Sequence, residues 1–164
     1  MNNDQSSTAQ QFSQLMQRPD IEQAAARYQE MDQKIRDALT VTFPALEWQQ
    51  DTPIAGAACG AGYPGLGGDG EVRGLPNWFA AGGIPDSQWD KAVSVVRGVA
   101  QGYGFDAGQV TVDRPNDHEV VFHDKYQAEL NIGAAANTTL LVRTGCHLTT
   151  EARKRGTPTP KPSY

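Results

Sequence analysis

Residues 110–143, VTVDRPNDHEVVFHDKYQAELNIGAAANTTLLVR, decide the fold. This stretch contains four short segments, separated by turn-forming residues. In each segment the side chains are either alternately apolar and polar or mostly apolar. The segments are Val110–Val112, Glu119–Phe122, Glu129–Ile132 and Thr139–Arg143. Such alternation, interrupted by Asp, Asn, Pro and Lys at the turns, is typical of consecutive β-hairpins. We therefore expect an antiparallel meander of four strands.

Two amphipathic helices are expected before this meander. Apolar residues recur with a period of 3.6 in residues 21–39 and again in residues 86–104, and this period indicates helices with one buried face. The first stripe consists of Ile21, Ala24, Ala25, Tyr28, Met31, Ile35, Ala38 and Leu39, and the second of Trp89, Ala92, Val93, Val96, Val99, Ala100 and Tyr103. Pro19 suits the first turn of the first of these helices.

A short helix with Thr8 as its N-cap is also expected to end near Arg18, and residues 45–49 alternate like a strand. The fold class that follows is α+β, with an antiparallel sheet of about four to five strands. Two main helices pack on one face of this sheet, and the short N-terminal helix is added to them. We divide the chain into a flexible tether (1–7), a single α+β domain (8–150) and a basic, Pro-rich tail (151–164).

Residues 53–86 contain ten glycines and four prolines, and this density of breakers predicts a long loop without regular elements. The loop contains two formal G-x-G-x-x-G matches, at residues 60–65 and 65–70. A dinucleotide site needs that motif between a strand and a helix of a βαβ unit, and no such unit surrounds it here. No nucleotide or other cofactor is expected.

Composition excludes several classes of protein. The 164 residues carry 14 Lys+Arg against 19 Asp+Glu, a formal net charge of −5, and the mean hydropathy is −0.53. An acidic chain of this kind is a poor nucleic-acid binder because phosphate contacts supply most of that affinity. No stretch of the sequence has the roughly 18 consecutive apolar residues of a membrane-spanning helix.

The three histidines and the two cysteines do not form a recognisable catalytic or metal-binding motif. His118 and His123 are five positions apart, so on one strand they face opposite sides, although Asp113, Asp117 and Asp124 lie close in sequence and could supply oxygen ligands. His147 adjoins Cys146, but adjacent residues on a strand point apart, so we reject a Cys–His nucleophile. No catalytic residue and no metal site is predicted.

Cys59 and Cys146 leave two interpretations open. Two lone cysteines are buried free thiols in most cytosolic proteins, whereas in an exported protein they form a long-range disulfide. Three aromatic residues are candidate ligand or lid contacts: Trp78, Phe79 and Trp89. Core packing is the alternative for each of them.

Several of these features together resemble the LppA-type lipoproteins of mycobacteria and related actinobacteria. The resemblance is carried by the helix from Ile21 to Leu39, by Trp48, by the Gly56-Ala57-Ala58-Cys59 step, by Trp78-Phe79, by the Val93/Val96 helix and by Thr144-Gly145-Cys146-His147-Leu148. It implies an exported, lipid-anchored envelope protein in which Cys59 pairs with Cys146. The resemblance also implies that this sequence is the mature part of such a lipoprotein, with the signal peptide and the acylated cysteine removed.

For function, the resemblance and the absent catalytic motifs together favour a non-enzymatic binding module on the outer face of the cell membrane. Its partner would be an envelope protein or a wall or lipid component. The alternative is a carrier or sensor of a lipid-like molecule, with an apolar pocket between helix 86–104 and the sheet. The identity of the ligand and the role of His118, His123 and His147 are not determined by the sequence.

Overall fold

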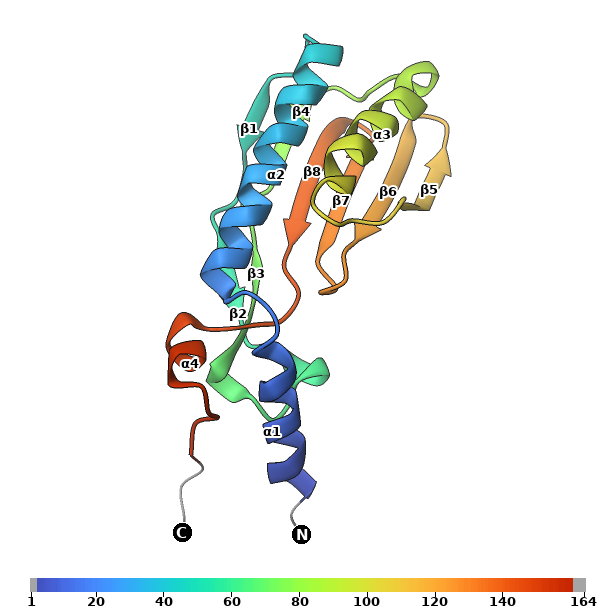
Figure 1. The fold of residues 1–164 in the computed structure, drawn as a ribbon. Helices are drawn as coiled ribbons and strands as arrows, with labels where there is room; N and C mark the ends of the chain where they lie inside the picture. The colour runs from blue at the N-terminus through green and yellow to red at the C-terminus, as the bar shows by residue number, and fades with distance from the viewer. Residues whose placement is uncertain (1–2, 161–164) are drawn as a thin grey trace.

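The structure is a computed structural model that describes residues 3–160. Its helices are α1 (Asn3–Leu15), α2 (Ile21–Thr42), α3 (Asp86–Gln101) and α4 (Thr150–Arg155). Its strands are β1 (Trp48–Gln50), β2 (Ala55–Ala57), β3 (Gly70–Gly74), β4 (Trp78–Ala81), β5 (Gln109–Arg114), β6 (Asp117–His123), β7 (Glu129–Ala134), β8 (Asn137–Arg143) and β9 (His147–Leu148). Helices α2 and α3 lie on one face of the sheet, and α1 and α4 lie beyond one end of it, away from α3 (Figure 1).

The predicted meander is present: β5, β6, β7 and β8 pair in consecutive antiparallel hairpins. The sheet as a whole is larger than expected, since it has nine strands instead of four to five. Its main path runs β1-β4-β8-β7-β6-β5, and β2, β3 and β9 extend it beyond β8 towards the opposite end of the molecule. The α+β class is therefore correct, and the predicted strand number is wrong.

The extra strands come from residues 53–86, where we expected a loop without regular elements. This region forms β2, β3 and β4, with two short 3-10 turns (Gly60–Gly62 and Gly67–Asp69) between β2 and β3. Strand β4 is paired on both sides, with β1 and with β8, so its backbone groups are satisfied by neighbours that are distant in sequence. Long-range pairing overrides the local glycine signal here.

The boundaries of α2 follow from its capping residues. The carboxylate of Asp20 accepts a hydrogen bond from the N–H of Gln23, and the Gln23 side chain accepts one from the N–H of Asp20, which is a complete capping box. Pro19 therefore precedes the cap instead of lying in the first turn as predicted. The helix continues three residues beyond the predicted range of 21–39 and stops at Thr42.

Both ends of the chain contain more helix than the sequence suggested. Helix α1 begins at Asn3, so residues 3–7, assigned above to a tether, have helical backbone, and Thr8 is not an N-cap. Helix α4 occupies residues assigned to the tail. It is capped by the Thr149 hydroxyl, which accepts from the N–H of Ala152, and it ends at Gly156 in the left-handed conformation (φ 76°).

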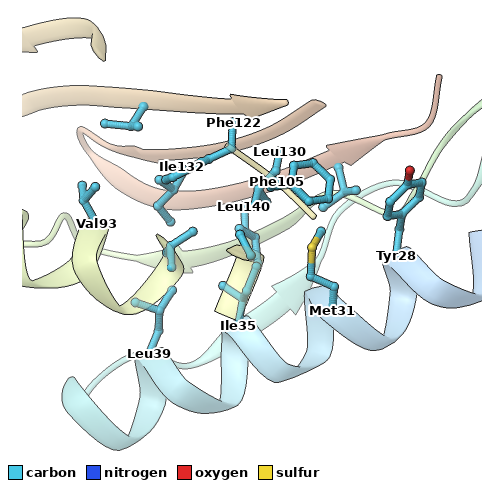
Figure 2. Packing of buried hydrophobic residues seen from close by; sticks show 14 of the residues in the cluster. Tyr28, Met31, Ile35, Leu39, Val93, Phe105, Phe122, Leu130, Ile132 and Leu140 are labelled. Atoms are coloured by element: carbon cyan, nitrogen blue, oxygen red, sulfur yellow. The ribbon is translucent and has the colours of Figure 1, made fainter. Parts of the chain in front are cut away.

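The larger of two hydrophobic clusters, which we call the upper core, lies between the two long helices and the sheet. Tyr28, Met31, Ile35 and Leu39 of α2 point towards residues of the sheet, among them Leu130, Ile132 and Leu140 (Figure 2). The predicted apolar stripes of α2 and α3 supply most of the helical side of this core, and the stripe residues Val99 and Tyr103 are only partly buried.

The smaller cluster, which we call the lower core, joins segments from across the chain. It consists of Phe12, Leu15, Tyr63, Leu66, Cys146, Leu148 and Ala152, with Met16, Cys59 and Val72 packed against them. Cys59 and Cys146 form a disulfide, with their Cα atoms 5.5 Å apart. The disulfide fastens the turn after β2 to the segment before β9, inside the lower core.

Among residues 3–160, no helix is both long enough and apolar enough to cross a membrane.

Candidate functional site

Two of the three aromatic residues proposed as ligand or lid contacts, Trp78 and Trp89, pack with the upper core. Trp78 lies on β4 and packs against the upper core, and the guanidinium carbon of Arg36 lies 3.7 Å from the centroid of its indole ring. Phe79 is next to it on the strand and therefore points to the opposite face of the sheet. Trp89 is a buried member of the upper core. None of the three lies on a mobile loop over a pocket.

The space proposed for a lipid-like ligand, between α3 and the sheet, is filled by side chains. Val93, Val96 and Ala100 of α3 are buried there, together with Val120 and Phe122 of β6. The expected pocket is therefore occupied by the upper core, and a candidate site has to be sought elsewhere.

His118 is held between two carboxylates. Its Nε2 lies 2.6 Å from Oδ1 of Asp86, at the start of α3, and its Nδ1 lies 3.1 Å from Oδ1 of Asp113 on β5. The hydrogen bond with Asp86 raises the pKa of His118, with a further contribution from Asp113, and holds the pKa of Asp86 below its usual value. Because both ring nitrogens are occupied, His118 ties α3 to the β5–β6 hairpin and is not available to a substrate.

The other residues singled out near this hairpin are dispersed. His123 faces away from α3, as the spacing predicted, and its Nε2 lies 3.4 Å from Oε1 of Glu129. Asp117 pairs with Arg114 at 2.8 Å. In the part of the chain that the structure describes, no three His, Cys, Asp or Glu side chains are grouped so that they could hold a metal ion.

The best candidate site is a recess of about 310 Å³ between the two cores, which we call the His147 cavity. It is formed by the α1–α2 junction, α2, the end of α3, the β6–β7 turn and β9. Its lining residues are Pro19, Ala24, Arg27, Tyr28, Tyr103, Gly104, Asp124, Lys125, Tyr126 and His147. The volume lies at the small end of the range of ligand sites.

His147 has an unused acceptor at this cavity. Its side chain is fully buried, and its Nδ1 lies 2.9 Å from the carbonyl oxygen of Pro19. Since a carbonyl only accepts, the hydrogen is assigned to Nδ1, and Nε2 is left with a lone pair. Within residues 3–160 this Nε2 has no hydrogen-bond partner.

The charge state of His147 follows from its surroundings. Burial lowers its pKa, and the nearby positive charge of Arg18 acts in the same direction, although the hydrogen bond with Pro19 opposes them. The imidazole is therefore neutral at pH 7, and Nε2 is a free acceptor. A buried acceptor without a partner costs free energy, so most such groups pair with protein, ordered water or a ligand.

A second polar group in the cavity is fully satisfied. The Tyr28 hydroxyl donates a short hydrogen bond to Oδ2 of Asp124, and Oδ1 of Asp124 accepts from the N–H groups of Tyr126 and Ala128 at 2.9 Å each. Burial and the Asp124 carboxylate both raise the pKa of Tyr28. This arrangement fixes the β6–β7 turn against α2 and makes one side of the cavity rigid.

Aromatic rings and cations complete the cavity. The Tyr126 ring meets the His147 ring edge to face, with centroids 5.6 Å apart. Arg18 lies behind Tyr126, with its guanidinium carbon 5.3 Å from the ring centroid, and donates a 2.8 Å hydrogen bond to the carbonyl oxygen of Cys146. Tyr103 forms another wall of the cavity.

The sequence did not reveal this site. We had considered His147 only as a neighbour of Cys146, and the rejection of a Cys–His nucleophile is consistent with the structure, since Cys146 is in a disulfide and the imidazole binds Pro19. The useful signal would have been the three tyrosines, which are far apart in sequence and gather around one histidine.

Comparisons with known proteins agree with the fold. The model of the LppA family, "Lipoprotein confined to pathogenic Mycobacterium", matches residues 1–150. The crystal structure of the lipoprotein LppA from Mycobacterium tuberculosis is similar, with a TM-score of 0.77 and 16% identity, over 97% of this chain and 96% of that chain.

A second solved structure, a DUF4853 family protein from Actinomyces odontolyticus ATCC 17982, has a TM-score of 0.61 and 17% identity, over 88% of this chain and 72% of that one. At such identities the likeness shows the fold alone. No curated protein sequence gives a significant match. The family match covers nearly the whole chain, and on this ground the chain belongs to the LppA family of lipoproteins.

Proposed function

We propose that this lipoprotein is a non-enzymatic binding module, held by a lipid anchor on the outer face of the cell membrane, and that it binds a small ligand in the His147 cavity. The observation that carries the proposal is the unpartnered Nε2 of His147 in a recess lined by three tyrosines. Buried polar groups are almost always paired, so an unpaired acceptor beside an open recess favours a ligand with a donor group.

The polar groups of the cavity support binding more than catalysis. The carboxylate of Asp124 accepts from three donors and is not free to act as a base, and the Tyr28 hydroxyl is committed to that carboxylate. Within residues 3–160, neutral His147 has no titratable group hydrogen-bonded to it, because Nδ1 binds a backbone carbonyl and Nε2 has no partner. A general base works with a positioned nucleophile, and no nucleophile is paired with His147.

The proposal is tested on the lipid-anchored, oxidised protein, expressed in an actinobacterial host and released from the membrane. Bound small molecules are extracted and identified by mass spectrometry, beside the variants Tyr103→Ala in the cavity and Phe79→Ala on the far face of the sheet. We expect a stoichiometric ligand in the wild type and in Phe79→Ala, and its loss in folded Tyr103→Ala.

Two results would overturn the proposal. If the wild-type extract is empty and a protein partner is crosslinked, the protein binds that partner through its outer surface and takes no small ligand in the cavity. Recovery of the ligand in a chemically altered form after incubation with fresh protein would identify an enzyme.

A further inference from the structure

Two exposed cations lie at the His147 cavity, each over a tyrosine ring. The guanidinium carbon of Arg27 lies 4.9 Å from the centroid of Tyr103, and Nζ of Lys125 lies 5.1 Å from that of Tyr126. These contacts position the charges without using the N–H donors that point away from the rings. Within residues 3–160 neither cation forms an ion pair with a carboxylate, although the chain has more acidic than basic residues.

Among residues 3–160, the one carboxylate that lines the cavity, Asp124, forms no ion pair with either of these cations. Both oxygens of Asp124 accept hydrogen bonds, from the Tyr28 hydroxyl and from the N–H groups of Tyr126 and Ala128. The lining therefore carries two positive charges with free donors and one negative charge whose oxygens are engaged. A guanidinium and an ammonium with free donors are suited to a phosphate or carboxylate.

The other lining residues of the cavity favour uncharged groups of a ligand. The neutral Nε2 of His147 carries a lone pair that can accept a hydrogen bond. A ligand hydroxyl group, which can donate one, is therefore a suitable partner. The rings of Tyr103 and Tyr126 offer flat apolar surface to the body of a ligand. A volume of about 310 Å³ limits that body to a single small ring.

We infer, resting on the proposed function, that the His147 cavity takes an anionic sugar of monosaccharide size. Its phosphate or carboxylate lies against Arg27 and Lys125, its ring lies between the two tyrosines, and one hydroxyl donates to Nε2 of His147. The same chemistry is offered by a free sugar phosphate and by the headgroup of an anionic glycolipid, and the experiment separates these two sources.

The experiment is an NMR titration of the oxidised protein labelled with ¹⁵N. The probes are glucose 6-phosphate, glucose, inorganic phosphate and octyl glucoside 6-phosphate. The side-chain ¹⁵N signal of His147 Nε2 is the specific readout, because it shifts when a lone pair accepts a hydrogen bond. We expect glucose 6-phosphate to shift this signal with saturation, and glucose and inorganic phosphate to bind about tenfold more weakly or worse.

The charge contribution is isolated by a double variant and a matched control. Arg27→Ala/Lys125→Ala removes the two cations of the cavity, and Lys91→Ala/Lys154→Ala removes two exposed cations elsewhere. The first variant should weaken glucose 6-phosphate binding about tenfold or more, and the second should leave it within about a factor of two. Because all four side chains are exposed, both variants are expected to fold.

Each outcome is decisive. Tighter binding of the octyl probe than of glucose 6-phosphate would support the inference and point to a lipid headgroup, and equal binding would support it and point to a free sugar. If glucose binds as tightly as its phosphate, or if Arg27→Ala/Lys125→Ala behaves like its control, the inference is overturned, while the cavity still binds a ligand. If no probe shifts His147 Nε2, the inference is overturned for the whole ligand class, and mass spectrometry of the extracted protein still decides the proposed function.

Discussion

The imidazole of His118 lies flat against the indole of Trp89, with ring centroids 5.2 Å apart and planes 17° apart. Trp89 belongs to the upper core, and the two carboxylates that hold His118 come from α3 and β5. The stack therefore joins a buried helix to the edge of the sheet through a titratable group. Stability should depend on the protonation of that group.

The variant His118→Phe keeps the stacked ring and loses both hydrogen bonds to Asp86 and Asp113. Since the pKa of His118 is raised in the folded protein, its contribution is complete below the unfolded value of about 6.5 and is lost as pH rises through the folded pKa. The pKa of Asp86 is lowered, so its contribution is present above about 3.9 and is lost as pH falls further.

The stability difference between wild type and His118→Phe should therefore be largest between about pH 4 and 6.5 and should shrink at higher pH. Urea unfolding at a series of pH values measures it. His123→Gln is the control, since His123 is exposed, and it should show little effect. If the difference in unfolding free energy between wild type and His118→Phe stays constant up to pH 9, folding does not raise the pKa of His118.

Asp32 is a buried carboxyl group on α2. Burial raises its pKa to about 6, although Nε of Arg36 lies 3.1 Å away. The charged form is therefore disfavoured in the folded state, and the wild type loses stability as pH rises from about 4 to 6. Asp32→Asn should gain about 3 kcal/mol relative to wild type over this range.

Chemical denaturation at pH 4 and pH 7 provides the measurement for Asp32. The variant Asp37→Asn, at an exposed position on the same helix, should show no such gain. Equal pH dependence of the wild type and Asp32→Asn would show that the Asp32 carboxyl titrates normally.

Trp78 and Phe79 are neighbours on β4 and point to opposite faces of the sheet. Trp78→Ala removes a side chain from the upper core and the ring that lies under Arg36, so we expect a loss of about 3 kcal/mol in the free energy of unfolding. Phe79→Ala should cost about 1 kcal/mol, because the side chain is not part of that core. Similar losses for both variants would be incompatible with these orientations.

The disulfide closes a loop over a sequence separation of 87 residues. In the chain-entropy model, Cys59→Ser/Cys146→Ser should lower the free energy of unfolding by about 4 kcal/mol. Because the disulfide lies in the lower core, amide hydrogen exchange at Leu148 should accelerate more than at Leu140 of the upper core. Reduction of the wild type should reproduce the variant, and uniform acceleration would show that the two cores unfold as one unit.

The parts of the fold that could be predicted are those with a local pattern. Helices α2 and α3 and strands β5–β8 each carry their own apolar periodicity, and all were expected within a few residues. Strand β3 has no such pattern in Gly70–Gly74, and it is a strand because β2, β8 and β9 pair with it from elsewhere in the chain. Local signals do not contain this information.

The candidate site could not be predicted from the sequence for the same reason. Tyr28, Tyr103, Tyr126 and His147 lie on four separate segments, and only the packing of the two cores brings them together. Each residue alone has an ordinary structural explanation. The unpaired Nε2 becomes visible only when the partners of every neighbouring atom are known.

Gly70 touches the disulfide directly. A Cβ atom at this position would lie 3.0 Å from Sγ of Cys59 and 3.2 Å from Sγ of Cys146, with Leu66 close behind. A side chain at position 70 would therefore collide with the disulfide, and we expect a relative that keeps both cysteines to keep glycine here. In a relative that has lost them to smaller residues, the space that they vacate would accept alanine, so the three positions are expected to vary together.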